Sequence, residues 1–166
     1  MFNRFVKDAR KLVIRARETA CSGGSPTVEA EHLLLALTEP RGGALAELLA
    51  SAGLDREGVD LAIGAENERS LAAVGVSAHE FDLPPLGPRG GEPRFAASAK
   101  LALERSMKIA VARGDHRIES GHVLLGVLDA SHGTVPRALE LAGIDRKDLS
   151  SRVEAAMLAG ALGDRR

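Results

Sequence analysis

The stretch EHLLLALT at residues 31–38 decides the fold, because it recurs as GHVLLGVL at residues 121–128. Both copies are apolar on nearly every side, which is typical of a helix buried at the centre of its unit. Outward from this stretch, a shift of ninety positions aligns residues 4–66 with 94–156 without a gap. Of the 63 aligned pairs 17 are identical, whereas average composition gives roughly 4 to 5. The chain is therefore an internal duplication.

The residues around this stretch predict four helices in each repeat. The first helix keeps one face apolar and ends at a glycine. Its residues are Phe5, Ala9, Val13, Ala16, Ala20 and Gly24, repeated as Phe95, Ala99, Leu103, Ser106, Ala110 and Gly114. A short third helix is predicted over residues 44–52, and a fourth begins at Asp55 or Asp145, whose carboxylates can cap it. We expect an all-α fold, an eight-helix bundle made of two pseudo-symmetric four-helix repeats.

Between the repeats the composition changes. Residues 70–93 include a run of prolines and glycines from Pro84 to Pro93, which disfavours regular helix. We therefore expect residues 1–69 to form the first repeat, residues 70–93 a linker, and residues 94–166 the second repeat. The two repeats together are expected to make one domain.

The composition excludes several classes of function. The net charge of −1 offers no attraction for nucleic acid or for an acidic membrane surface. The absence of Trp and Tyr removes the usual stacking platforms for bases. Cys21 is the single cysteine, so an internal disulfide is excluded. Residues 1–5 lack the apolar stretch of a signal peptide, and we expect a cytoplasmic protein that binds neither nucleic acid nor membranes.

The sequence contains no motif of a catalytic or cofactor site. A Gly-x-x-x-x-Gly-Lys-Ser/Thr phosphate loop does not occur, and no serine lies in Gly-x-Ser-x-Gly. No His-x-x-x-His pair or second cysteine supplies metal ligands at helical spacing. We therefore expect no enzyme activity, no cofactor and no metal.

The remaining polar residues are interpreted as structural. His32 and His122 lie at equivalent positions near the start of the central helices, and we expect each to form a hydrogen bond within its own repeat. Arg15 and Arg105 are also equivalent, and we interpret them, together with Arg4, Arg10, Arg17 and Arg94, as residues of solvated helix faces balanced by neighbouring acids.

Six segments together resemble the repeats of Clp N-terminal domains. They are MFNRF (1–5), ARxxVxxA (9–16), EHLLLAL (31–37) and LxxAGL (49–54) in the first copy, and FxxxAKxxLE (95–104) and HVLLG (122–126) in the second. The resemblance covers almost the whole chain outside the linker. It is specific because both copies occur in register and follow the family's opening residues.

The resemblance implies a domain that receives substrates, adaptors and regulators of Clp unfoldases of the ClpC and ClpA type. As a free-standing chain it is similar to solitary Clp N-domain proteins of actinobacteria. We expect a monomeric, non-catalytic binding module. It would act as a decoy for cyclic peptide antibiotics of the cyclomarin type, or as an adaptor-like regulator of Clp proteolysis. The alternative is a structural accessory subunit that docks on a Clp chaperone–protease complex.

The resemblance also implies candidate ligand residues. In the ClpC branch, cyclic peptides bind at positions that correspond here to Phe2, Val13, Phe95, Lys100, Leu103 and Glu104. Phenyl rings would supply apolar area, while Lys and Glu would supply directional polar contacts. The alternative interpretation makes Phe5 and Phe95 equivalent core anchors, and Lys100 and Glu104 an exposed i, i+4 pair.

A phosphoarginine site is a further implication of the resemblance. ClpC-type domains use a glutamate immediately before the histidine of each central helix. The first repeat keeps this residue as Glu31, whereas the second has Gly121 at the equivalent position. We therefore expect one weakened site at most.

Overall fold

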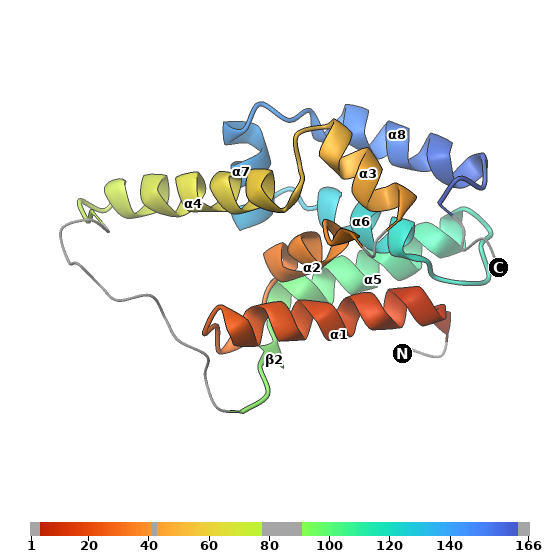
Figure 1. Ribbon diagram of the computed structural model, residues 1–166, viewed down its shortest axis with the longest axis horizontal. Helices are drawn as coiled ribbons and strands as arrows, with labels where there is room; N and C mark the ends of the chain where they lie inside the picture. Colours follow the sequence, from red (N-terminus) through yellow and green to blue (C-terminus); the bar gives the residue numbers. More distant parts are fainter. Residues whose placement is uncertain (1–3, 41–42, 78–90, 163–166) are drawn as a thin grey trace.

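The chain folds into two sets of helices that pack against each other (Figure 1). The computed structural model describes residues 4–40, 43–77 and 91–162. The elements of these ranges are α1 (Lys7–Ser22), β1 (Thr27–Val28), α2 (Ala30–Leu37), α3 (Ala44–Ser51), α4 (Arg56–Ala72), β2 (Arg94–Phe95), α5 (Ala97–Ala112), α6 (Ser120–Leu128), α7 (Thr134–Leu141) and α8 (Arg146–Leu158). The all-α fold with two four-helix repeats is confirmed.

The helix ends follow the repeated sequence signals. Gly24 after α1 and Gly114 after α5 have φ angles of 70° and 75°, a conformation that favours glycine. Asp55 accepts a hydrogen bond from the amide of Gly58 at the start of α4. Asp145 caps α8 in the same way. Equivalent residues in the two repeats therefore begin and end equivalent helices, as predicted.

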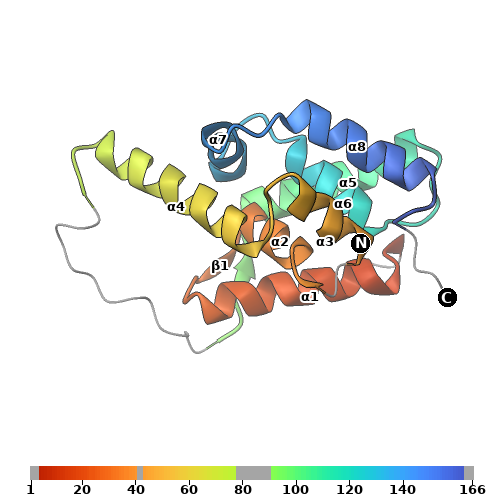
Figure 2. The same cartoon turned by 45° about the horizontal axis from the view of Figure 1, so that its top comes forward.

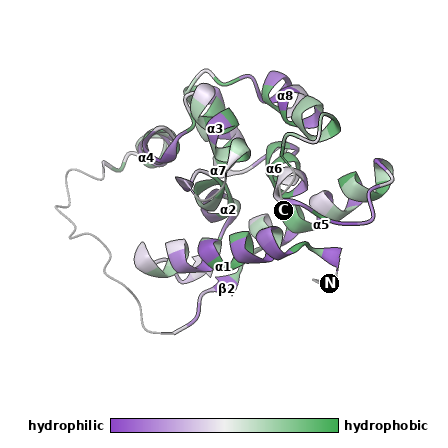
Figure 3. Cartoon of the chain, turned by 45° about the vertical axis from the view of Figure 1, so that its right-hand side comes forward, coloured by the Kyte–Doolittle hydropathy of each residue, from purple (hydrophilic) through white to green (hydrophobic). Residues whose placement is uncertain are grey.

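Helices α2 and α6 form the centre of the core. Leu33 of α2 and Leu124 of α6 are fully buried, and every residue of α6 from Gly121 to Leu128 is buried. Polar and apolar residues alternate along the outer helix α1 (Figure 3), because only one of its faces contacts the core. None of the described helices is both long enough and apolar enough to cross a bilayer.

Two short stretches of parallel backbone pairing join the first repeat to the second. Phe95 of β2 pairs with Val28 of β1, and Phe5 pairs with Ile118 in an isolated parallel bridge. The two pairings are equivalent, because Phe5 is ninety positions before Phe95 and Ile118 is ninety positions after Val28. Each repeat thus supplies a segment to the other, and the pseudo-two-fold relation builds one domain. These pairs were not predicted from the sequence.

Helix α4 projects from the body of the molecule (Figure 2). It continues through Ala72, so the prediction that the linker starts at residue 70 was wrong by three residues. No proline occurs between Ser70 and Leu83 to end the helix earlier. Most of the predicted linker, residues 78–90, lies outside the described residues.

Candidate ligand-binding site

Phe95 lies at the junction between the repeats, where three elements meet. Its ring is half-buried against the core. The guanidinium of Arg17, from α1, lies 5.5 Å from the centre of the ring, a distance typical of a cation–π contact. Arg17 also donates a hydrogen bond of 3.0 Å to the carboxylate of Glu92. An aromatic surface and a cation from different repeats are thus brought together.

At the equivalent junction in the other half of the domain, the aromatic residue is buried. Phe5, the repeat equivalent of Phe95, is only 2% exposed. The equivalent of Arg17 is Met107, which packs against the core as a partly buried apolar residue. The interpretation of Phe5 as a core anchor is therefore confirmed, whereas Phe95 keeps part of its ring at the surface.

The other predicted ligand residues fall into two groups. Val13 and Leu103 are buried in the core, so they lie beneath any ligand rather than at the surface. On α5, Lys100 is exposed and Glu104 is half-buried; the two side chains form no ion pair. Phe2 lies outside the described residues. The predicted polar contacts of Lys100 and Glu104 remain available to a ligand.

Glu31, the phosphoarginine candidate, is a half-buried residue of α2. Burial raises the pKa of its carboxyl, and the neighbouring carboxylates of Glu29 and Glu66 raise it further. In the second repeat, a Cβ atom added at Gly121 would lie 2.7 Å from the sulfur of Met157. The second repeat therefore lacks the carboxylate, and a side chain from α8 covers the place where it would begin.

The two equivalent histidines form hydrogen bonds within their own repeats, as predicted, and these bonds cap α2 and α6. The Nδ1 atom of His32 accepts the backbone N–H of Glu29 at 2.9 Å, and His122 accepts that of Glu119 at 3.0 Å. Because Nδ1 is an acceptor, Nε2 of the neutral ring of His122 carries the proton and donates to Asp115 at 2.9 Å.

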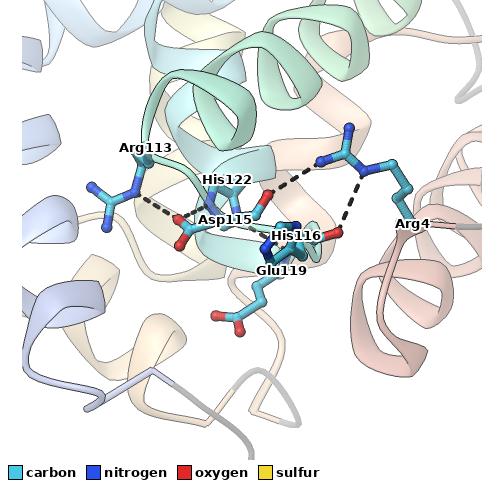
Figure 4. Close-up of polar contacts among 6 residues, drawn as sticks. All are labelled: Arg4, Arg113, Asp115, His116, Glu119 and His122. Atoms are coloured by element: carbon cyan, nitrogen blue, oxygen red, sulfur yellow. Dashed lines mark hydrogen bonds and ion pairs between the residues drawn. The ribbon is translucent and has the colours of Figure 1, made fainter.

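In the second repeat, Asp115 accepts hydrogen bonds from both His122 and Arg113 (Figure 4). Hydrogen bonds from His122 and Arg113 hold the pKa of Asp115 below its usual range. Arg4 donates to the backbone carbonyls of Asp115 and His116. Each of these polar groups is engaged in holding the loop before α6, which indicates a structural role. The described residues contain no group of three or more acidic, His or Cys side chains that could hold a metal ion.

Two pairs of charged residues correct the interpretation of Arg15 and Arg105. Arg15 lies 3.8 Å from Glu39, and its side chain is 16% exposed. Arg105 lies 4.0 Å from Asp129, and its side chain is 26% exposed. The two pairs are repeat equivalents. The predicted balance by neighbouring acids is confirmed for both arginines, but both side chains are less exposed than a solvated helix face would make them.

A third charged pair, which the sequence did not predict, links the repeats. Arg137 of α7 donates a hydrogen bond of 2.6 Å to Glu66 of α4. Glu66 is 2% exposed, and the hydroxyl of Ser70 donates to the same oxygen. Burial by itself would raise the pKa of Glu66, but the hydrogen bonds from Ser70 and Arg137 outweigh it and lower the pKa.

A separate depression of about 950 Å³ lies between α5, α6, α7 and α8. Its lining includes Ile109, Leu128, Ile144 and Ser150, and the predicted ligand residues lie elsewhere. Charged residues of both signs also line it, among them Glu140, Glu154, Arg146 and Lys147. We place the candidate site at Phe95 because an aromatic ring and a cation converge there from two repeats.

Comparison with known proteins confirms the resemblance. The model of the family "Clp repeat (R) N-terminal domain" matches residues 4–84 and 94–161. The chaperone protein ClpC1, chloroplastic, of Oryza sativa subsp. japonica is 31% identical over 153 residues, which cover 92% of this chain and 15% of that protein. The ClpA homolog of Brassica napus, a chloroplastic ATP-binding subunit of the ATP-dependent Clp protease, gives the same identity, with 92% and 16% covered.

Two solved structures share the fold. The N-terminal domain of ClpD from Arabidopsis thaliana has a TM-score of 0.66 at 18% identity, covering 95% of this chain and 96% of that one. The Hsp104 N-terminal domain from Candida albicans has a TM-score of 0.64 at 19% identity, covering 95% and 93%.

The duplicated helical fold and the family match define the class of protein. This chain belongs to the Clp repeat N-terminal domain family. It resembles the N-terminal domains of ClpC- and ClpA-type proteins and spans about 15% of the length of these curated relatives.

Proposed function

We propose that this chain is a non-catalytic receptor domain that binds peptide or protein segments of the Clp system at the junction beside Phe95. The observation that carries the proposal is the difference between two equivalent residues. Phe5 is buried in the core, while Phe95 keeps part of its ring at the surface. A partly exposed aromatic ring beside polar groups is a common anchor of protein interfaces.

The neighbouring residues give this surface a mixed character. Arg17 supplies N–H donors above the ring, and Lys100 and Glu104 supply one charge of each sign from α5. Val13 and Leu103 are buried in the core, so in this proposal they act beneath the ligand rather than in contact with solvent. An apolar ligand with a few backbone or side-chain polar groups fits this arrangement, because the ring provides area and the charges provide direction.

Within this function we favour two roles for a cytoplasmic monomer. As a decoy, the chain would sequester cyclic peptide antibiotics of the cyclomarin type and leave Clp unfoldases untouched. As an adaptor-like regulator, it would present or withhold substrates of Clp proteolysis. Support comes from the family membership. The alternative is an accessory subunit that docks on a Clp chaperone–protease complex.

Phosphoarginine is a minor part of the proposal. Glu31 is the candidate for the guanidinium, but Glu29 and Glu66 place negative charge around it, and that charge would repel the phosphate. We propose one weak site at most, because Gly121 and Met157 leave no equivalent in the second repeat. Calorimetric titration with phosphoarginine that gives two equal sites would contradict this.

The experiment that tests the proposal is a calorimetric titration with a cyclic heptapeptide of the cyclomarin type. It uses the wild type, Phe95→Ala and the control Leu61→Ala, which removes an apolar side chain that is 67% exposed on α4. Removing an anchor residue typically costs about 2 kcal/mol, so we expect Phe95→Ala to weaken binding at least about tenfold. Leu61→Ala should bind like the wild type.

The outcomes separate the roles. One-to-one binding that Phe95→Ala abolishes supports the decoy. A wild type that binds no cyclic peptide but co-sediments with a Clp unfoldase through Phe95 supports the regulator. Stable co-purification with a chaperone–protease complex that Phe95→Ala leaves unchanged supports the accessory subunit and contradicts a receptor site at Phe95.

A further inference from the structure

Arg17 holds a position that its repeat equivalent does not share. Its guanidinium lies over the Phe95 ring. It also donates a hydrogen bond to Glu92, which is three residues before Phe95 in the chain. At the equivalent place in the other half of the domain the residue is Met107, which packs against the core. The fold therefore needs only an apolar side chain at this place, and the charge of Arg17 is a feature of the Phe95 end alone.

The ion pair between Arg17 and Glu92 is weak, so another carboxylate can replace Glu92. The side chains are 41% and 84% exposed, and an ion pair between exposed residues contributes little because water competes for both partners. The Phe95 ring, in contrast, lies beneath the guanidinium, with the ring centre 5.5 Å from the guanidinium carbon. An arginine in a cation–π contact still has N–H groups that can donate to a carboxylate.

Glu92 thus resembles a ligand that the chain itself supplies. Its carboxylate lies 3.0 Å from Nη1 of Arg17, where a carboxylate from another molecule would bind. Among the described residues, Glu92 is the acid that pairs with Arg17. Once Glu92 moves away, the contact with the Phe95 ring still holds the guanidinium near the place where an incoming carboxylate would bind, so less conformational entropy is lost on binding.

We propose that Arg17 is a specificity-determining residue of the junction, and that it selects peptide segments carrying a carboxylate beside a large apolar side chain. The inference rests on the proposed function, because it requires that a ligand cover Phe95. The apolar side chain of the ligand packs on the exposed part of the ring. Its carboxylate replaces Glu92 on Arg17, and Glu92 acts as an internal competitor.

The first test compares peptide preferences by display selection from a random heptapeptide library. The selection is run on the wild type, on Arg17→Gln and on the control Arg56→Gln, which breaks a similarly exposed pair with Asp60 on α4. Glutamine keeps hydrogen-bond donors but removes the charge. We expect Asp or Glu beside an apolar residue to be enriched on the wild type and on Arg56→Gln. On Arg17→Gln the apolar preference should remain and the acidic preference should disappear.

The second test measures competition by Glu92. A selected peptide is synthesised as its C-terminal amide, and its affinity is measured for the wild type and for Glu92→Gln. Because an exposed ion pair is worth up to about 1 kcal/mol, we expect Glu92→Gln to tighten binding about threefold to fivefold. The analogue with Asn or Gln in place of the acidic residue should show no such gain. If only the peptide with a free C-terminus gains, the recognised carboxylate is a chain end rather than a side chain.

Two results would overturn the role of Arg17. Equal enrichment of acidic peptides on Arg17→Gln is one, and unchanged or weaker binding of both the amidated and the free peptide to Glu92→Gln is the other. Failure of the underlying function has a different signature, since a folded wild type would then enrich no peptide at all. Enrichment of apolar peptides without acids leaves the proposed function standing and contradicts only the selection by Arg17.

Discussion

The backbone of Phe95 pairs with that of Val28, so the segment carrying the candidate ligand residue is held by the opposite repeat. The amide of Ala96 donates to the carbonyl of Val28 at 3.0 Å. The amide of Val6 donates to the carbonyl of Ile118 at the same distance. A ligand at Phe95 therefore contacts both repeats at once, and the stability of their contact affects its binding. Four predictions address contacts within and between the repeats.

Arg137→Ala should destabilise the domain by about 2 kcal/mol, because it leaves the buried carboxylate of Glu66 with Ser70 as its remaining partner. Since the folded pKa of Glu66 is lowered, its contribution is present above its unfolded pKa and is lost as the pH falls through the folded pKa. Urea denaturation at neutral and acidic pH measures both effects. Arg56→Ala, which breaks an exposed pair, should cost much less at either pH.

Gly126→Ala should cost about 2–3 kcal/mol, although alanine is the better helix former. Its Cβ would lie 2.3 Å from the carbonyl oxygen of Ala102, so α5 and α6 would have to separate. Gly121→Ala is the matched variant, because its Cβ meets only the flexible end of Met157. Thermal unfolding should place Gly121→Ala within about 1 kcal/mol of the wild type. Equal losses for the two variants would argue against a close approach of the backbones at Gly126.

Glu31→Gln should stabilise the domain slightly at neutral pH, by about 0.5 kcal/mol. The folded pKa of Glu31 is raised by burial and by two carboxylates. A raised carboxyl contributes stability below its unfolded pKa and loses it as the pH rises through the folded pKa. The gain from the substitution should therefore fade in acid. Denaturation curves at two pH values check the sign, and a neutral-pH loss would contradict the crowding of acids around Glu31.

His122→Ala should cost about 3 kcal/mol, because it leaves the amide of Glu119 without its acceptor and opens a cavity at a side chain that is 1% exposed. Asp115→Asn keeps an acceptor for Nε2 of His122 and should cost less. Because the folded pKa of Asp115 is lowered, its stabilising effect is lost as the pH falls. The difference between wild type and Asp115→Asn in urea midpoints should shrink in acid.

The repeat explains what the sequence predicted well. Equivalent residues such as Asp55 and Asp145 cap equivalent helices, because these signals act over a few residues and occur twice. The backbone pairs at Val28 and Ile118 have no such signal, since a strand of two residues shows no periodicity. The pair of Glu66 and Arg137 joins residues far apart in the chain. The repeat does not predict it, because the equivalent residues are Ala156 and Glu47.

The candidate site was predicted only in part, for the same reason. The resemblance pointed to Phe95, but its partner Arg17 comes from the other repeat, and Glu92 belongs to the segment predicted as linker. Nothing in the local pattern of α1 marks Arg17 as different from Arg10 and Arg15. The difference appears when the aligned Met107 is compared with Arg17 in the folded domain.

The central claim is that ligands bind at the junction beside Phe95. Its most direct test is an NMR titration of the isotopically labelled chain with a peptide selected on it by display. We predict that the largest amide shifts occur at Phe95, Lys100 and Arg17, and that Phe95→Ala removes them. Shifts concentrated instead at Ile144 and Ser150, in the depression between α6 and α8, would contradict the claim and move the ligand site there.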